Sequence, residues 1–260
     1  MIRLSACLIT LNEERNLPRV LTSLQDIVDE ILIVDAGSTD RTCVIARHHD
    51  AKVFVRDWTG YAAQRNFAAS QAAHDWILAL DADEELSERL RDSIKRWKSG
   101  EPLHRVYEVN RLTWYLGAWI KHSGWYPDRK KRLYERGAAR FEGKVHEALK
   151  FNGVAGRLDG ELYHYTVRSF EEHVANVNRY TTLAAQQLAE SGKRVWRPGM
   201  LLAPSWSWLQ TFVLQAGFLD GYRGWLIARM AARSVYLKYK KLGALIGSGE
   251  MDNPPRGWTK

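Results

Sequence analysis

The chain has 260 residues, of which 45% are hydrophobic and 26% are charged, so it suits one large globular domain or a domain with an appendage. This composition excludes disordered, collagen-like and disulfide-scaffold proteins, and a mean hydropathy of −0.39 argues against a polytopic membrane protein. Eleven lysines and arginines against three acids follow residue 191, so the net charge of +8 belongs entirely to the last 69 residues. The two cysteines, Cys7 and Cys43, lack the spacing of a zinc or redox motif and are expected to be reduced.

Strands and helices alternate in the first third of the chain, a rhythm that predicts a mainly parallel sheet covered on both faces. We expect strands at residues 4–10, 30–34, 52–55 and 76–80. The first apolar run reaches polar residues without a cleavage-like segment, so we interpret it as a strand and not as a signal peptide. Apolar residues at helical spacing predict one helix over residues 17–24. Residues 38–40 are good caps for a second helix, and a third helix is expected over residues 61–73.

From about residue 104 the pattern changes to aromatic-rich extended segments, at residues 105–115, 131–135, 141–149 and 158–166. We expect these segments to complete the sheet and to wall a second site. Ser169 and Glu172 have the spacing of a capping box, which predicts a long helix towards Ser191. The predicted organisation is therefore an α/β domain over 1–191 with parts at about 1–103 and 104–191, a basic amphipathic helical region over 192–246, and a flexible tail over 247–260.

Polar clusters follow three of the predicted strands. Residues 10–14 follow the first strand, residues 35–40 follow the second, and Asp81 and Asp83 follow the fourth. Ligands of such sheets bind beyond the carboxyl ends of the strands, so we expect these clusters to converge on one rim.

Two acidic groups on this rim suggest particular chemistry. Asp81 and Asp83, spaced i and i+2 at the end of a buried strand, have the hard oxygen ligands that Mg²⁺ or Mn²⁺ prefers, although acids before a helix often only complement its dipole. Asp35 ends an apolar strand and is able to accept hydrogen bonds from a nucleobase or a ribose. It is equally suited to binding the amides of its own turn, and the sequence leaves this choice open.

Taken together, these clusters resemble glycosyltransferase family 2, whose members are inverting sugar-nucleotide enzymes with the GT-A fold. The resemblance rests on four segments in matching order and spacing, namely Thr10-Leu11-Asn12-Glu13, Val34-Asp35-Ala36-Gly37-Ser38-Thr39-Asp40, Gln64-Arg65-Asn66 and residues 75–84. It covers about the first hundred residues strongly. Further segments, among them Tyr126-Pro127-Asp128, Val145-His146-Glu147 and residues 217–221, look like those of the lipopolysaccharide inner-core β-1,4-glucosyltransferases.

The resemblance implies a role for each matching residue. The residues placed on the nucleotide are Thr10, Leu11, Asn12, Glu13, Asp35, Arg65, Asp81 and Ala82. Asp83 becomes the principal ligand of a divalent cation, with Asp81 beside it. A core position is the alternative for Leu11, and a solvated helix face is the alternative for Arg65.

Inverting transfer needs a carboxylate that takes the proton of the acceptor hydroxyl. The segment that ends at His146 and Glu147 resembles one in which the acid is a candidate base, so we predict Glu147 as the base and Asp128 as the second choice. We expect His146 and Arg132 on the phosphate or acceptor side of the site. A rim carboxylate, an interior histidine and a solvated basic face are the alternatives for these residues.

The basic region predicts contact with a membrane surface. Residues 198–219 carry no charge, but their polar residues and Pro204 make spanning a bilayer costly, whereas their aromatic residues suit the headgroup boundary. Residues 222–241 predict an amphipathic helix with basic residues on one side. The expected membrane-facing residues are Trp206, Trp208, Arg229, Arg233, Lys238, Lys240 and Lys241. Docking of these helices on the catalytic domain is the alternative.

The sequence thus predicts a metal-dependent inverting glycosyltransferase at the cytoplasmic face of the cell membrane. The resemblance implies UDP-glucose as the donor and a lipid-linked saccharide (the heptose of the lipopolysaccharide inner core) as the acceptor. No nucleic acid is expected as a partner, because no binding motif accompanies the basic charge. One alternative is a polyprenyl-phosphate glycosyltransferase, which needs no strong base because its acceptor is already ionised. Another alternative is a non-catalytic basic protein that binds membranes or nucleic acid.

Overall fold

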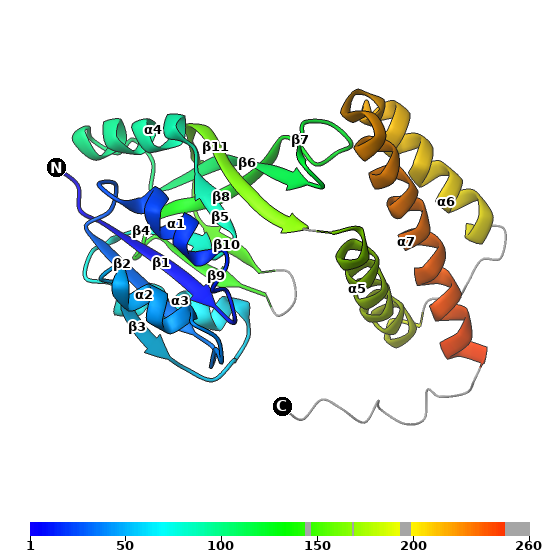
Figure 1. Cartoon of the computed structure of the whole chain (residues 1–260), viewed down its shortest axis with the longest axis horizontal. Helices are drawn as coiled ribbons and strands as arrows, with labels where there is room; N and C mark the ends of the chain where they lie inside the picture. The colour runs from blue at the N-terminus through cyan, green and yellow to red at the C-terminus, as the bar shows by residue number, and fades with distance from the viewer. Residues whose placement is uncertain (144–146, 168, 193–198, 248–260) are drawn as a thin grey trace. The chain divides into compact units, whose positions relative to one another are not determined.

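A computed structural model describes residues 1–143, 147–167, 169–192 and 199–247 (Figure 1). The chain divides into two compact units: unit 1 comprises residues 1–113 and 127–165, and unit 2 comprises residues 114–126 and 166–260. The sequence predicted a domain boundary after residue 191, whereas the units divide after residue 165. The reason is that the helix starting at residue 170 packs against the last helix of the chain and so belongs to unit 2. The functional limits of the predicted domains stay a prediction.

Four parallel strands form one half of the main sheet, in the order β3-β2-β1-β4. They are β1 (Leu4–Thr10), β2 (Glu30–Asp35), β3 (Lys52–Val55) and β4 (Trp76–Asp81), and the expected strand positions are confirmed to within one residue. The connecting helices are α1 (Leu17–Leu24), α2 (Thr42–His48) and α3 (Tyr61–Gln71). Because the strands run parallel, their carboxyl ends lie on one edge of the sheet.

Antiparallel strands complete the sheet beyond β4, in the order β8-β6-β11-β5, with β7 pairing to β6. Their bounds are β5 (Glu84–Leu86), β6 (Val106–Tyr115), β7 (Ala118–Ile120), β8 (Asp128–Glu135) and β11 (Gly156–Val167), and α4 (Glu88–Ser99) follows β5. The segment expected as one extended piece over residues 141–149 instead contributes to a separate two-stranded sheet of β9 (Ala139–Glu142) and β10 (Ala148–Phe151).

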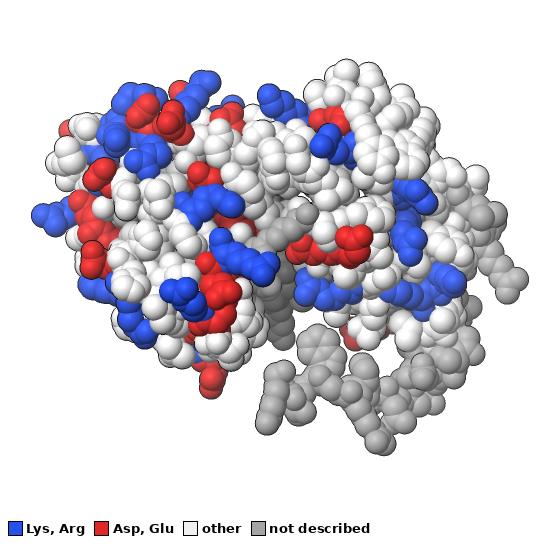
Figure 2. Space-filling view, in the orientation of Figure 1, with Lys and Arg blue, Asp and Glu red and all other residues white. Residues whose placement is uncertain are grey.

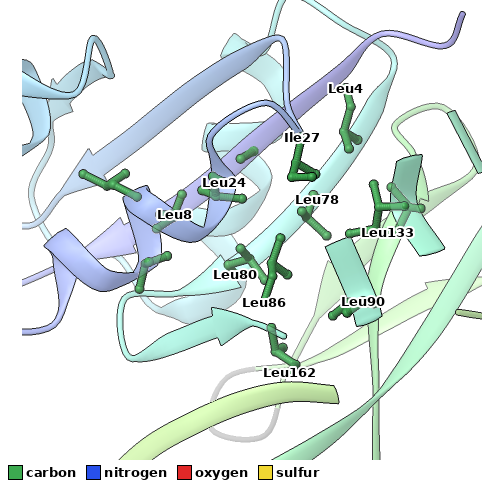
Figure 3. Close-up of a cluster of buried hydrophobic side chains, with 14 of the residues drawn as sticks. Leu4, Leu8, Leu24, Ile27, Leu78, Leu80, Leu86, Leu90, Leu133 and Leu162 are labelled. Atoms are coloured by element: carbon green, nitrogen blue, oxygen red, sulfur yellow. The ribbon is translucent and has the colours of Figure 1, made fainter. Parts of the chain in front are cut away.

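The alternation of side chains along β1 divides the interior of unit 1 into two hydrophobic clusters. Leu4 and Leu8 belong to the cluster that also contains Leu24 of α1 and Leu90 of α4 (Figure 3). Cys7 belongs to the other cluster, with Ala68 of α3, Phe141 of β9 and Leu149 of β10. The helix α3 and the β9–β10 sheet therefore cover the same face, which brings the residues of α3 close to the segment after β9.

Unit 2 is mainly helical and contains α5 (Phe170–Glu190), α6 (Gly199–Leu209), a π-helical turn η1 (Gln210–Leu214), a 3₁₀ turn η2 (Gly217–Asp220) and α7 (Gly221–Gly247). The Ser169 side chain accepts a hydrogen bond of 3.1 Å from the Glu172 backbone N–H, so the predicted cap of α5 is confirmed. The predicted amphipathic helix over residues 222–241 lies within α7. The predicted tail lies outside the described residues except for Gly247.

Candidate functional site

The three polar clusters meet at the carboxyl edge of the parallel strands, as the sequence predicted. Thr10 at the end of β1 is paired with Asp35 at the end of β2, and the preceding residue, Ile9, is paired with Asp81 at the end of β4. The Thr10 Oγ1 hydroxyl donates a 2.7 Å hydrogen bond to Asp35 Oδ2. Parallel pairing therefore places the polar ends of β1, β2 and β4 side by side.

Asp35 supports the turn that follows β2. It is fully buried, and it accepts hydrogen bonds from the Gly37 and Ser38 backbone N–H groups and from the Ser38 and Thr10 hydroxyls, at 2.6 to 3.0 Å. Burial alone would raise the pKa of Asp35, but the bonds from Ser38 and Thr10 outweigh it and lower the pKa. Of the two roles the sequence left open, the structure shows the contacts of the turn. A nucleobase would have to replace one of these donors.

The loop after β1 is fastened to the same turn. Asn12 has a φ of 56°, its backbone N–H donates to Ser38 Oγ at 2.8 Å, and its Oδ1 accepts from the Thr39 N–H at 2.9 Å. Glu13 Oε2 accepts from the Asn16 side chain at 2.7 Å. Leu11 is 51% exposed at this edge, so it is not a core residue. An exposed apolar side chain beside buried polar groups is a suitable surface for the face of a planar base.

Asp81 is held between two arginines. Arg65 of α3 pairs with Asp81 Oδ1, and Arg132 of β8 donates to Asp81 Oδ2 at 2.6 Å. Burial would raise the pKa of Asp81, but the positive charges of Arg132 and Arg65 outweigh burial and hold it well below its usual range. Arg65 is only 5% exposed, so the alternative that it lies on a solvated helix face is wrong. Arg132 is only 7% exposed, so it likewise does not belong to a solvated basic face.

Glu84 belongs to the same network and was not singled out from the sequence. Its carboxylate is fully buried, accepts from the Asp81 backbone N–H at 3.0 Å, pairs with Arg132, and lies 3.6 Å from Arg111 Nη1. Burial is the largest influence on Glu84 and raises its pKa, and the neighbouring Asp81 charge acts in the same direction. No local pattern marks Glu84, because Arg111 and Arg132 are contributed by β6 and β8, far along the chain.

The two candidate bases differ in their surroundings. Glu147 is 21% exposed, and its Oε1 lies 3.7 Å from Arg65 Nε. Asp128 accepts from Arg111 at 2.7 and 2.9 Å and pairs with Lys130 at 3.0 Å. Burial would raise the pKa of Asp128, but these cations outweigh burial and lower the pKa, so Asp128 is a weaker proton acceptor than an unpaired aspartate. His146 lies outside the described residues.

Unlike Asp81, Asp83 forms no ion pair with a described arginine or lysine. Its Oδ2 lies 3.3 Å from His164 Nε2, and its side chain is 24% exposed, while Ala82 between the two acids is buried. Among the described residues no three of His, Cys, Asp and Glu gather as a metal site. Mg²⁺ is commonly bound by one or two carboxylates together with phosphate oxygens, so Asp83 fits as a protein ligand of a metal diphosphate. Both oxygens of Asp81 are already paired.

The expected membrane-facing residues lie in unit 2. Trp206 is 57% exposed, Trp208 packs on Phe212 at 4.9 Å between ring centroids, and Arg229, Arg233 and Lys240 are exposed. Lys241 differs from the expectation, because its Nζ donates to three oxygens of α5 at 2.7 to 2.9 Å. Figure 2 shows few charged side chains where Figure 1 places the end of α6 and the start of α7. No described helix combines the length and the apolar character needed to cross a bilayer.

Comparison with known proteins agrees with this arrangement. The family described as "Glycosyl transferase family 2" matches residues 5–147. An "Uncharacterized glycosyltransferase" of Rickettsia typhi is 33% identical over 94% of this chain and 88% of its own length. A "Lipopolysaccharide core biosynthesis glycosyltransferase LpsC" of Rhizobium meliloti is 31% identical over 91% of this chain and 93% of its own length.

The solved structure of Staphylococcus aureus TarS in complex with UDP-GlcNAc is 15% identical, with a TM-score of 0.49 over 95% of this chain and 92% of that chain. The expected fold class is confirmed: a GT-A-like α/β architecture with a helical C-terminal region. The edge that joins Thr10, Asp35 and Asp81 lies inside the matched segment. The match covers more than half of the residues, and we conclude that the chain belongs to glycosyltransferase family 2.

Proposed function

We propose that this chain is an inverting, metal-dependent glycosyltransferase that moves glucose from UDP-glucose to a lipid-linked saccharide, the heptose of the lipopolysaccharide inner core. Its family and its similarity to the lipopolysaccharide core biosynthesis glycosyltransferase of Rhizobium meliloti support this assignment. The observation that carries the proposal is the position of Arg65, which pairs with Asp81 at the end of β4 and lies 3.7 Å from Glu147. The Arg65 guanidinium thus lies between Glu147, the candidate base, and the end of β4, where the donor diphosphate is expected.

The reaction requires one proton acceptor on the acceptor side. Glu147 takes the proton of the attacking hydroxyl while that oxygen forms a bond to the anomeric carbon of glucose. The bond from the anomeric carbon to the diphosphate oxygen breaks on the opposite face, and its electron pair leaves with UDP, so the configuration inverts. Arg65 positions the Glu147 carboxylate. Its own pairing with Asp81 keeps the guanidinium in place.

The donor is held along the carboxyl edge of the parallel strands. We assign the nucleoside to the surface formed by Leu11, Asn12 and Glu13, and Asp35 holds the turn against which this surface rests. Asp83 is the protein ligand of a divalent cation, Mg²⁺ or Mn²⁺. When bound, the cation supplies positive charge that offsets the charge of the departing diphosphate. Ala82, which lies buried between Asp81 and Asp83, remains assigned to the nucleotide site.

We assign the membrane contact to unit 2, at the inner face of the cell membrane. The exposed large apolar side chains from α6 to α7 are Leu202, Trp206, Leu209, Val213, Leu214, Phe218, Leu219, Tyr222, Tyr236 and Ile246. Exposed apolar surface of this extent is typical of interaction sites. Three nearby cations, Arg229, Arg233 and Lys240, are also exposed and match the charge of an anionic leaflet. A lipid-linked acceptor would reach the enzyme at such a membrane-bound surface.

The experiment that tests the catalytic assignment compares Glu147→Gln with the wild type on two acceptors. We expect transfer to a sugar hydroxyl to fall by about 10²-fold to 10⁴-fold in the variant, because general base catalysis contributes that much. Glu142→Gln is the matched control, since Glu142 is an exposed carboxylate at the end of β9. Undiminished transfer to the hydroxyl would reject Glu147 as the base. Transfer only to a polyprenyl phosphate, in both proteins, would favour the polyprenyl-phosphate alternative.

A second comparison separates an enzyme from a non-catalytic basic protein. Asp83→Ala should abolish metal-dependent binding of UDP, which is measured by calorimetry with and without Mn²⁺. Asp92→Ala is the control, because Asp92 is an exposed acid of α4. If the wild type bound no UDP and hydrolysed no UDP-sugar, yet bound oligonucleotides with a steep salt dependence, the enzymatic proposal would fail.

A further inference from the structure

A cavity of unit 1 that reaches from Asp81 to Glu147 is lined mainly by cations. Its volume is about 300 Å³, which is the lower end of the size range of small-molecule sites. The cationic lining residues are Arg65, Arg111, Arg129, Lys130, Lys131 and Arg132, and the acidic lining residues are Asp81 and Glu147. This composition indicates an anionic occupant, because a neutral sugar needs no such excess of positive charge.

The buried cations of the cavity are already paired, but they keep unused hydrogen-bond donors. Arg65 and Arg132 share Asp81, and Arg111 pairs with Asp128 and Glu84. Arg65 Nη1 and Arg132 Nε nevertheless have no hydrogen-bond acceptor among the described residues. A guanidinium has five N–H groups, so two carboxylates leave donors for further oxygens. A small movement of the side chains would direct these donors to a ligand.

The more exposed cations of the cavity have the weakest ion pairs with acidic residues of the chain. Lys131 is exposed and has no ion-pair partner among the described residues, and its Nζ lies 4.9 Å from the centroid of the Phe151 ring. Arg129 is 49% exposed and lies 3.7 Å from Glu108. Exposed ion pairs of this kind are weak, so Arg129 exchanges its partner readily. The outer part of the cavity therefore has positive charge available for a ligand.

The position of the outer part of the cavity assigns its charge to the acceptor. The inner part of the cavity is lined by Arg65 of α3 and Asp81 of β4, which the proposed function places beside the donor diphosphate. The outer part is lined by residues from β6 and β8, which lie beyond β4 in the sheet order, and from the separate β9–β10 sheet. Glu147 lines the cavity, so the hydroxyl that it deprotonates enters from this side. This step rests on the proposed function, in which Glu147 is the base.

We infer that the outer part of the cavity binds a phosphate group carried by the acceptor saccharide, and that Lys131 and Arg129 are its specificity-determining contacts. A phosphate monoester has three acceptor oxygens and a charge of about −1.5 to −2 at neutral pH, which suits several converging cations. The phosphate sets the distance between the sugar and Glu147. An acceptor without the phosphate reaches the base but is held less tightly.

The test uses the full chain, UDP-glucose and two forms of one acceptor: a truncated lipopolysaccharide whose core heptose carries a phosphate monoester, and the same acceptor after enzymatic removal of that phosphate. We expect kcat/KM to fall about tenfold without the phosphate, as for one lost charge-assisted hydrogen bond. Lys131→Gln and Arg129→Gln should each give a similar fall with the phosphorylated acceptor and little change with the other. Lys150→Gln is the matched control, because Lys150 is exposed on β10 and does not line the cavity.

Three results would overturn the inference. Equal kcat/KM for the two acceptors would refute the phosphate subsite and leave the proposed function intact. A rise in the KM for UDP-glucose in Lys131→Gln, with the acceptor KM unchanged, would assign the cavity to the donor diphosphate instead. If the wild type hydrolysed UDP-glucose but transferred glucose to neither acceptor, the proposed acceptor would be wrong, and the inference would fall with it.

Discussion

Replacement of Arg132 by methionine tests the buried ionic network at the end of β4. Arg132 is 7% exposed and pairs with both Asp81 and Glu84. Arg132→Met therefore removes the positive charge that these two carboxylates share. Asp81 keeps its pair with Arg65. Glu84, which is fully buried, keeps the hydrogen bond from the Asp81 backbone N–H, but the nearest arginine left to it is Arg111, whose Nη1 lies 3.6 Å away. The substitution therefore leaves Glu84 as the poorly compensated charge.

The size of the effect follows from the burial of the partners. Removal of one partner from a buried ion pair costs about 3 to 5 kcal/mol, because the remaining charge stays without compensation. Solvent screening gives little relief here, since neither Arg132 nor Glu84 is appreciably exposed. The residual attraction of Arg111 places the expected loss at the lower end, about 3 kcal/mol near neutral pH.

The loss should depend on pH. Burial, the largest influence, raises the pKa of Glu84, and the variant removes the lowering effect of Arg132, so this pKa rises further. A carboxyl with a raised pKa in the folded state contributes stability that is present at low pH and is lost as the pH rises through the folded value. The difference between variant and wild type should therefore shrink as the pH falls from 8 to 5.5.

Urea unfolding followed by far-ultraviolet circular dichroism measures this difference, with the slope m compared to detect changes in cooperativity. The double variant Arg132→Met with Glu84→Gln is the control, because it removes the uncompensated charge and keeps an oxygen for the Asp81 N–H. It should recover to within about 1 kcal/mol of the wild type. No recovery, or a single-variant loss that is the same at pH 5.5 and pH 8, would refute the reasoning.

Two further outcomes are expected. Gly160→Ala should lower the free energy of unfolding by about 3 kcal/mol, because Gly160 has a φ of +97° and an added Cβ would lie 2.3 Å from the Leu90 backbone nitrogen. The control Gly153→Ala should lower it by only about 1 to 2 kcal/mol, because Gly153 has a φ of +107° but open space around it. Equal losses of the two variants in urea unfolding would contradict the steric argument. Simultaneous change of Arg229, Arg233, Lys238 and Lys240 to Gln should weaken sedimentation with anionic vesicles at least about tenfold while UDP-glucose hydrolysis persists. Unchanged vesicle binding would reject the electrostatic part of the membrane proposal.

The sequence by itself determined the elements of the parallel half of the sheet. Apolar alternation and helical spacing depend only on neighbouring residues, so β1, β2, β3 and β4 lie where they were expected. The convergence of Thr10, Asp35 and Asp81 on one edge was also predictable, because parallel strands share a carboxyl end. The cap of α5 at Ser169 followed from local hydrogen-bonding chemistry alone.

The tertiary structure decided how the charges are partnered. Asp81 and Asp83 look equivalent in the sequence, yet Asp81 is held by Arg65 and Arg132, whereas Asp83 lies beside His164. The membership of Glu84 in the network depends likewise on strands that approach it from distant parts of the chain. Charged side chains interact through space over a few ångströms, and no sequence spacing encodes which of them the fold brings within that distance.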